Sequence, residues 1–405
     1  MTTARSSLFL TLTLITMFVS SPVSAHGVIP KQFFDETSRQ IQFPDTAEFK
    51  TLVLDPHTHS SFSDGHVWPS VRVAEALFDG LDALAITEHL EWQPHRADVP
   101  HPDRNRAYEI ALEANGDNEL MIIAGAEITR ALPAGHINAL FISDANKLVK
   151  HPELEDQTDV RAYYEGAGQW PAQEAVNAAN DQGAFLFWNH AWWGSDFPNG
   201  MPKAPKFHKD NAKRNLIHGI EIANGDSYSE ESFQIALDLG LTLIGVSDIH
   251  GLIDWDFVPH EGGHRPVTLV LAKEKSQASM REALFDGRTV VWFKNLLIGR
   301  KDNVQALLAA SMIVKSATYK KGSDILTLEI QNVSDASFQL QNMSGMTLTG
   351  SADIVDIEPQ AVTTVGVRTG TRKDQLSIQF AVLNALTKPK KAAKFKLNID
   401  AIDAL

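Results

Sequence analysis

The chain has 405 residues, and its 36 Lys and Arg against 50 Asp and Glu give a formal net charge of −14. This length allows one large domain of up to ~250 residues and a smaller one, and the acidic charge argues against binding to a nucleic-acid polymer, which requires a cationic face. Because the chain has no Cys, disulfides and thiolate metal ligands are excluded, which leaves His, Asp and Glu for metal chemistry.

The first 25 residues have the pattern of a secretory signal peptide. Arg5 precedes an apolar run over 8–19, and small residues before position 26 offer a cleavage site near Ala25. The apolar run is shorter than the ~20 residues that span a bilayer. We therefore expect a periplasmic or secreted protein without stable membrane insertion.

Short apolar runs alternate with helix-like segments between residues 51 and 297. The runs predicted as strands are 51–54, 83–87, 121–124, 137–142, 184–188, 219–222 and 242–246. The segments predicted as helices are 71–79, 104–114, 172–181 and 232–239. Continuous apolar runs are typical of buried parallel strands, so this pattern predicts seven βα-type units.

The pattern changes after residue 300. An Ala- and Leu-rich stretch over 304–317 predicts a connecting helix. The short alternating runs that follow are 325–331, 337–341, 353–357, 362–367, 375–382 and 394–398. The expected organisation is therefore a signal peptide at 1–25, an α/β barrel over 26–300, and a linker helix with a small β-sandwich domain over 301–405.

Potential metal ligands gather at the ends of the predicted strands. His57 and His59 follow the first strand and, as alternate residues of an extended chain, face the same side. The others near strand ends are Asp64, His89, Glu127, His136, His190, Asp248 and His250. Since the C-terminal ends of barrel strands converge on one rim, these side chains predict a site for divalent metal ions. The alternative, individual histidines with partners in loops, is favoured for those away from the strand ends, which are His66, His151, His208 and His218.

Four motifs together resemble the polymerase and histidinol phosphatase (PHP) family over residues 51–297. They are His57-Thr58-His59 with Asp64, Thr87-Glu88-His89, His190, and Asp248-Ile249-His250. The resemblance implies a distorted seven-stranded (βα) barrel that holds two or three divalent metal ions and hydrolyses phosphate esters. Glu88 stands where many members have Asp, and we expect it behind the ligands.

The resemblance also implies a distribution of ligands. One metal would be held by His57, His59, Glu127 and Asp248. Glu127 would bridge to a second metal bound by His136 and His190, and a third site would be formed by Asp64, His89 and His250. Mixed imidazole and carboxylate ligands suit manganese, zinc and iron, and the ligand set does not choose among the three. Manganese is taken as the favoured metal, with zinc or iron as alternatives.

Such metals would neutralise phosphate charge and supply a bridging hydroxide that attacks phosphorus. The residues expected to take part in catalysis are Asp64, His89, Asp248 and His250. The sequence leaves open whether Asp64 or a nearby His acts as the general acid.

Segments 92–95, 99–106 and 263–268 are similar to those of an exported PHP subgroup that carries a C-terminal β domain and includes phosphodiesterases. Arg104 and Arg265 are predicted to clamp a phosphate oxygen, and His264 to contact substrate. Salt bridges that order the loops are the alternative role for both arginines. Three tryptophans have two possible roles: they either line a pocket for an organic ester group or pack within loops. They are Trp92, Trp192 and Trp193.

The favoured function is a secreted metal-dependent hydrolase of phosphate esters, with phosphodiesters slightly favoured over monoesters. Its expected partner is a small-molecule phosphate ester. One alternative is a phosphomonoesterase that acts on nucleotide or sugar phosphates. A further alternative is an amide or lactone hydrolase. The last is a non-catalytic metal-binding structural module, and the complete ligand set disfavours this module. The sequence leaves the oligomeric state open.

Overall fold

The computed structural model describes residues 40–193 and 197–403, and these described residues belong to one compact unit. The signal peptide expected at 1–25 lies outside the described residues. In the described part, no helix combines the length and the apolar character needed to cross a membrane.

All seven strands predicted for the barrel are present. They are β1 (Lys50–Asp55), β2 (Ala83–Ile86), β3 (Met121–Thr129), β4 (His136–Leu140), β5 (Phe185–Trp188), β6 (Gly219–Asn224) and β8 (Thr242–Val246). The sheet order is β1-β2-β3-β4-β5-β6-β8, with most neighbours parallel. The uniform βα pattern was wrong at one point: β4 is antiparallel to both β3 and β5. Only residues 130–135 join β3 to β4, and a parallel crossover needs a dozen residues or more.

The barrel closes where β8 meets β1, at their C-terminal ends. The backbone N–H of Asp248 donates to the carbonyl of His57 (3.0 Å), and the N–H of His59 donates to the carbonyl of Ile249 (3.1 Å). Thr58 and Ile249 form a parallel bridge between these bonds. The residues just after β1 and β8 therefore bring His57, His59 and Asp248 side by side.

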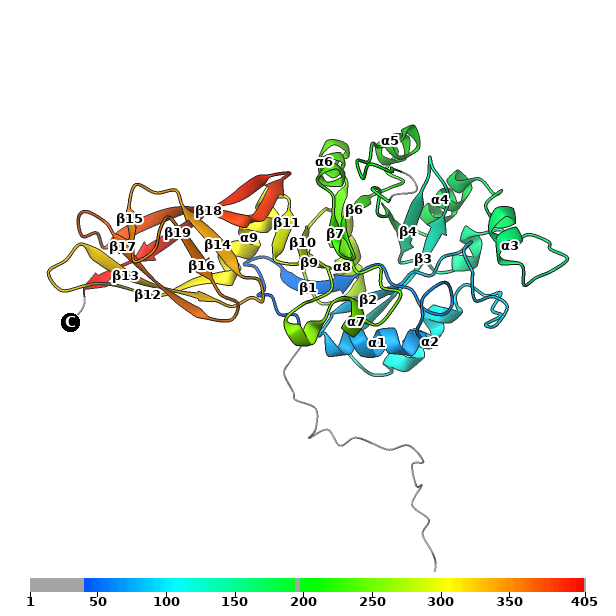
Figure 1. The fold of residues 1–405 in the computed structure, drawn as a ribbon, viewed down its shortest axis with the longest axis horizontal. Helices are drawn as coiled ribbons and strands as arrows, with labels where there is room; N and C mark the ends of the chain where they lie inside the picture. The colour runs from blue at the N-terminus through cyan, green and yellow to red at the C-terminus, as the bar shows by residue number, and fades with distance from the viewer. Residues whose placement is uncertain (1–39, 194–196, 404–405) are drawn as a thin grey trace, which may run out of the picture. The chain divides into compact units, whose positions relative to one another are not determined.

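The barrel interior is apolar below this rim. The alternate residues Leu52 and Leu54 of β1 are buried together with Phe185 and Phe187 of β5. The helices predicted next to the barrel strands are present as α1 (Pro69–Phe78), α2 (Arg106–Asn115), α4 (Ala172–Asp181) and α6 (Glu230–Leu239) (Figure 1). The structure adds β7 (Ser227–Tyr228), α3 (Val160–Ala167), α5 (Lys206–Lys213), α7 (Ile253–Asp256) and α8 (Gln277–Phe285).

The predicted helix over 304–317 is shorter than expected. The structure has α9 (Lys301–Ser311) followed by β12 (Met312–Tyr319). Strand β12 pairs along its length with β13 (Ile325–Asn332). The β-branched Ile313 and Val314 suit this pairing better than a helix, which explains the change at residue 312.

The C-terminal β-sandwich is confirmed. One sheet contains β15 (Thr347–Thr349), β17 (Val362–Arg368), β13, β12 and β20 (Ile402–Asp403). The other contains β16 (Ile354–Ile357), β14 (Phe338–Asn342), β18 (Gln375–Lys388) and β19 (Lys391–Asp400).

The second of these sheets continues into the barrel strands. After β8 the chain adds β9 (Val267–Ala272), β10 (Thr289–Phe293) and β11 (Leu296–Gly299) beside β1. Strand β18 pairs in parallel with β11, with Leu297 opposite Ala385 and Ile298 opposite Leu386. Backbone hydrogen bonds therefore join the C-terminal strands to the part that carries the potential metal ligands.

Candidate metal centre

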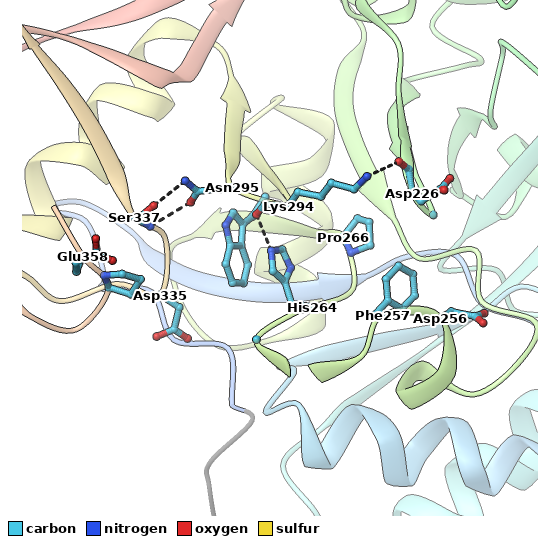
Figure 2. Close-up of a pocket in the computed structure, with 15 residues that line it drawn as sticks. Asp226, Asp256, Phe257, His264, Pro266, Lys294, Asn295, Asp335, Ser337 and Glu358 are labelled. Carbon is cyan, nitrogen blue, oxygen red and sulfur yellow. Dashed lines mark hydrogen bonds between the residues drawn. The ribbon is translucent and has the colours of Figure 1, made fainter. Parts of the chain in front are cut away.

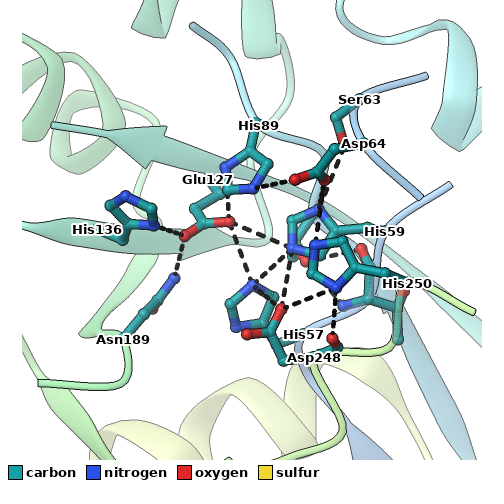
Figure 3. Close-up of polar contacts among 12 residues, drawn as sticks. His57, His59, Ser63, Asp64, His89, Glu127, His136, Asn189, Asp248 and His250 are labelled. Atoms are coloured by element: carbon teal, nitrogen blue, oxygen red, sulfur yellow. Dashed lines mark hydrogen bonds and ion pairs between the residues drawn. The ribbon is translucent and has the colours of Figure 1, made fainter. Parts of the chain in front are cut away.

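The side chains predicted as metal ligands converge at the C-terminal rim of the barrel (Figure 3). Close contacts connect all nine, which are His57, His59, Asp64, His89, Glu127, His136, His190, Asp248 and His250. The Nε2 atoms of His57 and His59 lie only 2.9 Å apart. Two imidazole nitrogens that face each other at this distance suit a shared cation.

Glu127 of β3 lies at the centre of the cluster and is fully buried. Its Oε1 is 2.8 Å from His136 Nδ1 and 3.8 Å from His190 Nε2. Its Oε2 is 3.2 Å from His57 Nε2 and 3.0 Å from His89 Nδ1. The two oxygens therefore face different histidines, as expected for a carboxylate that bridges two metal ions.

Asp248 and Asp64 lie on either side of His59. Asp248 Oδ1 is 3.1 Å from His59 Nε2 and also 3.1 Å from His57 Nε2. Asp64 Oδ1 is 3.1 Å from His250 Nε2, and its Oδ2 is 3.4 Å from His89 Nε2. Asp64, His89 and His250 thus lie together, and His89 also joins them to Glu127 through its Nδ1 (3.0 Å).

The carboxylates and imidazoles of the cluster shift each other's pKa. Burial alone would lower the pKa of His57, but the charges of Asp248 and Glu127 outweigh it and raise that pKa well above the usual value. Burial would raise the pKa of Glu127, but the imidazoles of His89 and His57 hold it well below its usual value. Glu127 is therefore ionised at neutral pH, the form in which a carboxylate binds metal.

The donor set fits divalent metal ions. Three groups have ligand atoms within 4.8 Å of one another: His59, Asp64, His89 and His250; His57, His59 and Glu127; and His89, Glu127 and His136. Among the described residues, the buried atoms Asp64 Oδ1 and Asp248 Oδ1 have imidazole nitrogens 3.1 Å away but make no hydrogen bond of good geometry. A buried carboxylate oxygen that lacks a well-aligned hydrogen-bond donor carries an uncompensated charge. A cation bound by this oxygen and by the neighbouring imidazole nitrogens would compensate that charge.

Glu221 of β6 supports the ligands from behind, and sequence reasoning missed it. It is fully buried, and its Oε1 lies 2.7 Å from His57 Nδ1. Asn224 Nδ2 donates to Glu221 Oε2 and to Asp248 Oδ2, both at 2.9 Å. A signal was present: a Glu inside the apolar run over 219–222 needs a buried partner.

Glu88 lies behind the ligands, as expected. The hydroxyls of Ser60 and Ser63 both donate to its carboxylate. Ser63 Oγ is in turn 3.2 Å from His59 Nδ1. Glu88 therefore acts on the orientation of His59 through Ser63.

A cavity of about 980 Å³ opens above the cluster. Its lining includes six of the potential ligands, which are Asp64, His89, His136, His190, Asp248 and His250. The remaining lining is mainly uncharged and includes four aromatic residues, and Arg130 is the only Arg or Lys among its described residues. A small organic molecule can therefore reach the ligand atoms.

Two of the residues predicted to bind substrate have other partners. Arg104 donates from Nη2 to Tyr163 Oη (2.8 Å). Arg265 is fully buried, and its guanidinium bonds Asp79 (2.8 Å) and Asp55 (3.2 Å). The described lining of the cavity above the ligands includes neither arginine. These contacts favour the alternative role, ion pairs and hydrogen bonds that order the loops.

The third such residue, His264, lies in a different cavity of about 500 Å³ (Figure 2). Its ring stacks on Trp292 with centroids 3.4 Å apart, and its Nε2 is 2.6 Å from the carbonyl oxygen of Lys294. Residues of the C-terminal domain, among them Asp335 and Ser337, line the same cavity. His264 is therefore in position to contact this cavity rather than the metal ligands.

Comparisons with known proteins agree with this geometry. A crystal structure of a two-domain protein from Bacteroides vulgatus, which contains a predicted PHP-like metal-dependent phosphoesterase, is 37% identical to the chain. The match covers 90% of this chain and 100% of that one, with a TM-score of 0.78. The family model described as an Ig-like domain matches residues 313–398. None of the curated proteins matches the chain.

Two other solved structures are more distant. A protein from Bifidobacterium adolescentis described as a metal-dependent phosphoesterase is 19% identical, covering 49% of this chain and 88% of that one, with a TM-score of 0.35. An amidohydrolase from Chromobacterium violaceum is 17% identical, covering 49% of this chain and 87% of that one, with a TM-score of 0.33. No functional conclusion rests on these two.

The barrel, its ligand cluster and the Bacteroides relative together define a metal-dependent hydrolase. The chain belongs to the PHP-like metal-dependent phosphoesterases, with a C-terminal Ig-like β domain added to the PHP barrel.

Proposed function

We propose that the chain is an exported metal-dependent hydrolase of phosphate esters that favours diesters over monoesters. The observation that carries the proposal is the nine-residue ligand cluster, six members of which line a cavity large enough for an organic ester. Glu127, whose oxygens face different histidines, would hold two ions together.

Bound divalent ions would neutralise the phosphoryl oxygens and lower the pKa of a bound water. The chain's own residues hold and orient the reactants. Glu221 fixes His57 through a buried hydrogen bond, and Asn224 fixes Asp248 through a partly buried one. Thr129 and Ser227 add uncharged hydrogen-bonding groups to the cavity lining and would orient the ester.

The charge of the cavity supports the preference for diesters. Arg130 is buried and forms an ion pair with the fully buried Glu91. Glu91 Oε2 also accepts a hydrogen bond from the N–H of Thr129 (2.7 Å). The charge of Arg130 is thus already compensated. A monoester dianion carries two negative charges and would gain more from an additional cation in the cavity than a diester, which carries one.

The test is a substrate comparison with Mn²⁺-loaded protein. We expect turnover of bis(p-nitrophenyl) phosphate, slower turnover of p-nitrophenyl phosphate, and little or none of p-nitrophenyl acetate. Faster monoester hydrolysis would favour the phosphomonoesterase alternative. The absence of phosphate ester turnover with Mn²⁺, Zn²⁺ and Fe²⁺ alike would overturn the proposal.

Two further parts of the proposal have their own measurements. Manganese as the native metal is tested by elemental analysis of protein purified without added metal, where zinc or iron would point to the alternatives. Export is supported by the signal-peptide pattern over 1–25. Cell fractionation and N-terminal sequencing should find an exported chain that begins near His26.

A further inference from the structure

The cavity above the metal ligands has two aromatic walls. The first consists of Trp92, which follows β2, and Tyr164 of α3, whose rings are perpendicular with centroids 5.8 Å apart. The second consists of Trp192 and Trp193, which follow β5. Because β3 and β4 lie between β2 and β5 in the sheet, the walls come from opposite sides of the β3–β4 pair. That pair carries Glu127 and His136.

Trp193 makes the direct connection between an aromatic wall and the ligands. Its ring centroid lies 5.2 Å from that of His136 and 5.7 Å from that of His190. Half of its side chain nevertheless remains exposed. A flat group held beside these histidines would cover the exposed indole and gain the burial energy of an aromatic contact.

The neighbouring tryptophan is fixed in place. The indole Nε1 of Trp192 donates to Ser227 Oγ (3.1 Å), and Ser227 Oγ donates to the carbonyl of Asn224 (3.0 Å). These bonds tie Trp192 to Ser227 of β7 and to Asn224, the last residue of β6, whose side chain also donates to Asp248. The wall is therefore positioned before substrate arrives, which reduces the entropy lost on binding.

We propose that this cavity selects phosphate diesters whose non-leaving ester group, the one that stays on phosphorus, is flat and aromatic, and that Trp193 packs against that group. The inference rests on the proposed phosphoesterase function and adds the class of substrate. The aromatic walls favour flat rings over short alkyl groups. Arg130 is the one Arg or Lys among the described lining residues, and it is paired with Glu91. The described lining therefore offers no unpaired Arg or Lys to a second anionic group on the substrate.

Two diesters with the same leaving group test the selection. Phenyl p-nitrophenyl phosphate and ethyl p-nitrophenyl phosphate both release p-nitrophenol, so they differ in the group that stays on phosphorus. Trp193→Ala should lower the ratio of their kcat/KM values by roughly threefold to tenfold relative to wild type. Trp193→Phe should keep most of the preference.

Trp255→Ala is the matched control, because Trp255 is 73% exposed and does not line the cavity. An unchanged ratio in Trp193→Ala would overturn the proposal.

A binding measurement separates this inference from the proposed reaction. Calorimetry with metal-loaded protein should show tighter binding of diphenyl phosphate than of diethyl phosphate, and Trp193→Ala should remove most of the difference. Equal binding of the two compounds by the wild type would contradict the aromatic selection. Selective binding of diphenyl phosphate without hydrolysis of any phosphate ester would support the aromatic selection and refute the proposed reaction.

Discussion

Glu221 Oε1 lies 2.7 Å from Nδ1 of His57, and both side chains are fully buried. Since Nδ1 faces Glu221, the Nε2 of the same ring is turned toward His59 and Glu127. The other oxygen of Glu221 accepts the backbone N–H of His190 at 2.5 Å. One carboxylate behind the ligands therefore orients residues on two sides of the metal site.

Glu221→Gln should weaken metal binding without unfolding the protein. The amide has the size of the carboxylate, but it lacks the charge that raises the basicity of the His57 ring. Loss of such a supporting carboxylate typically costs 10–100-fold in metal affinity or activity. Titration of metal-free protein with Mn²⁺ measures the change, and Glu119→Gln, at a residue whose side chain is 91% exposed, is the control. Equal affinities in the three proteins would show that Glu221 only fills space.

Glu127→Gln should reduce both metal content and activity. Its two oxygens face separate histidines, so the substitution removes a charged ligand from both positions. Loss of several kcal/mol of transition-state stabilisation corresponds to a fall in rate of roughly 10²–10³-fold. Elemental analysis and hydrolysis of bis(p-nitrophenyl) phosphate measure the effects, and circular dichroism checks the fold. A variant that retains full metal content would contradict the bridging role.

The ligand cluster could be predicted from sequence because most ligands lie at or soon after the C-terminal ends of strands, although His136 begins the antiparallel β4 and Asp64 lies in the loop after β1. The continuous apolar runs indicated buried strands, and their C-terminal ends meet on one rim. His57, His59 and Asp248 are therefore neighbours although they lie far apart in the chain. The motif resemblance then indicated a role for each position, which strand ends alone do not supply.

The partners of charged side chains could not be predicted in the same way. Arg265 lies beside a substrate-like loop in sequence, but its buried ion pairs with Asp55 and Asp79 depend on how β9 packs against β1. The antiparallel β4 was missed because apolar periodicity does not carry strand direction. The strand after residue 311 was missed because its pairing with β13 overrides the local helical pattern.

Asn384→Ala should destabilise the connection between the barrel strands and the C-terminal domain. The buried Asn384 amide donates to the carbonyls of Asn295 and Ser337, both at 2.8 Å, and accepts the N–H of Gln339 at 3.0 Å. Removal leaves these backbone groups without their partner, at a cost of about 1–3 kcal/mol. Thermal unfolding measures the loss. Asn398→Ala on the exposed face of β19 is the matched control, and equal melting temperatures for the two variants would refute the role of Asn384.

His208 should make the protein less stable as the pH falls below about 6.5, the usual pKa of an exposed imidazole. Its ring is buried against Trp188, with centroids 3.9 Å apart, and its Nε2 lies 2.6 Å from the carbonyl oxygen of Ala134. Burial lowers the pKa of His208 to about 3 in the folded state, although the Ala134 carbonyl partly opposes the shift. The unfolded chain therefore binds a proton first, and stability that is fully present above pH ~6.5 is lost progressively toward pH ~3.

The slope attributable to this ring is at most about 1.4 kcal/mol per pH unit. His208→Gln cannot titrate, so it should be less stable than wild type at pH 8, and the difference should shrink by up to about 2 kcal/mol between pH 6.5 and pH 5. Urea unfolding at several pH values measures both curves, and taking their difference cancels the titration of the other histidines. His260→Gln, at an exposed position, should follow the wild-type curve. A constant offset between wild type and His208→Gln at every pH would show that His208 binds its proton equally well in the folded and unfolded chains.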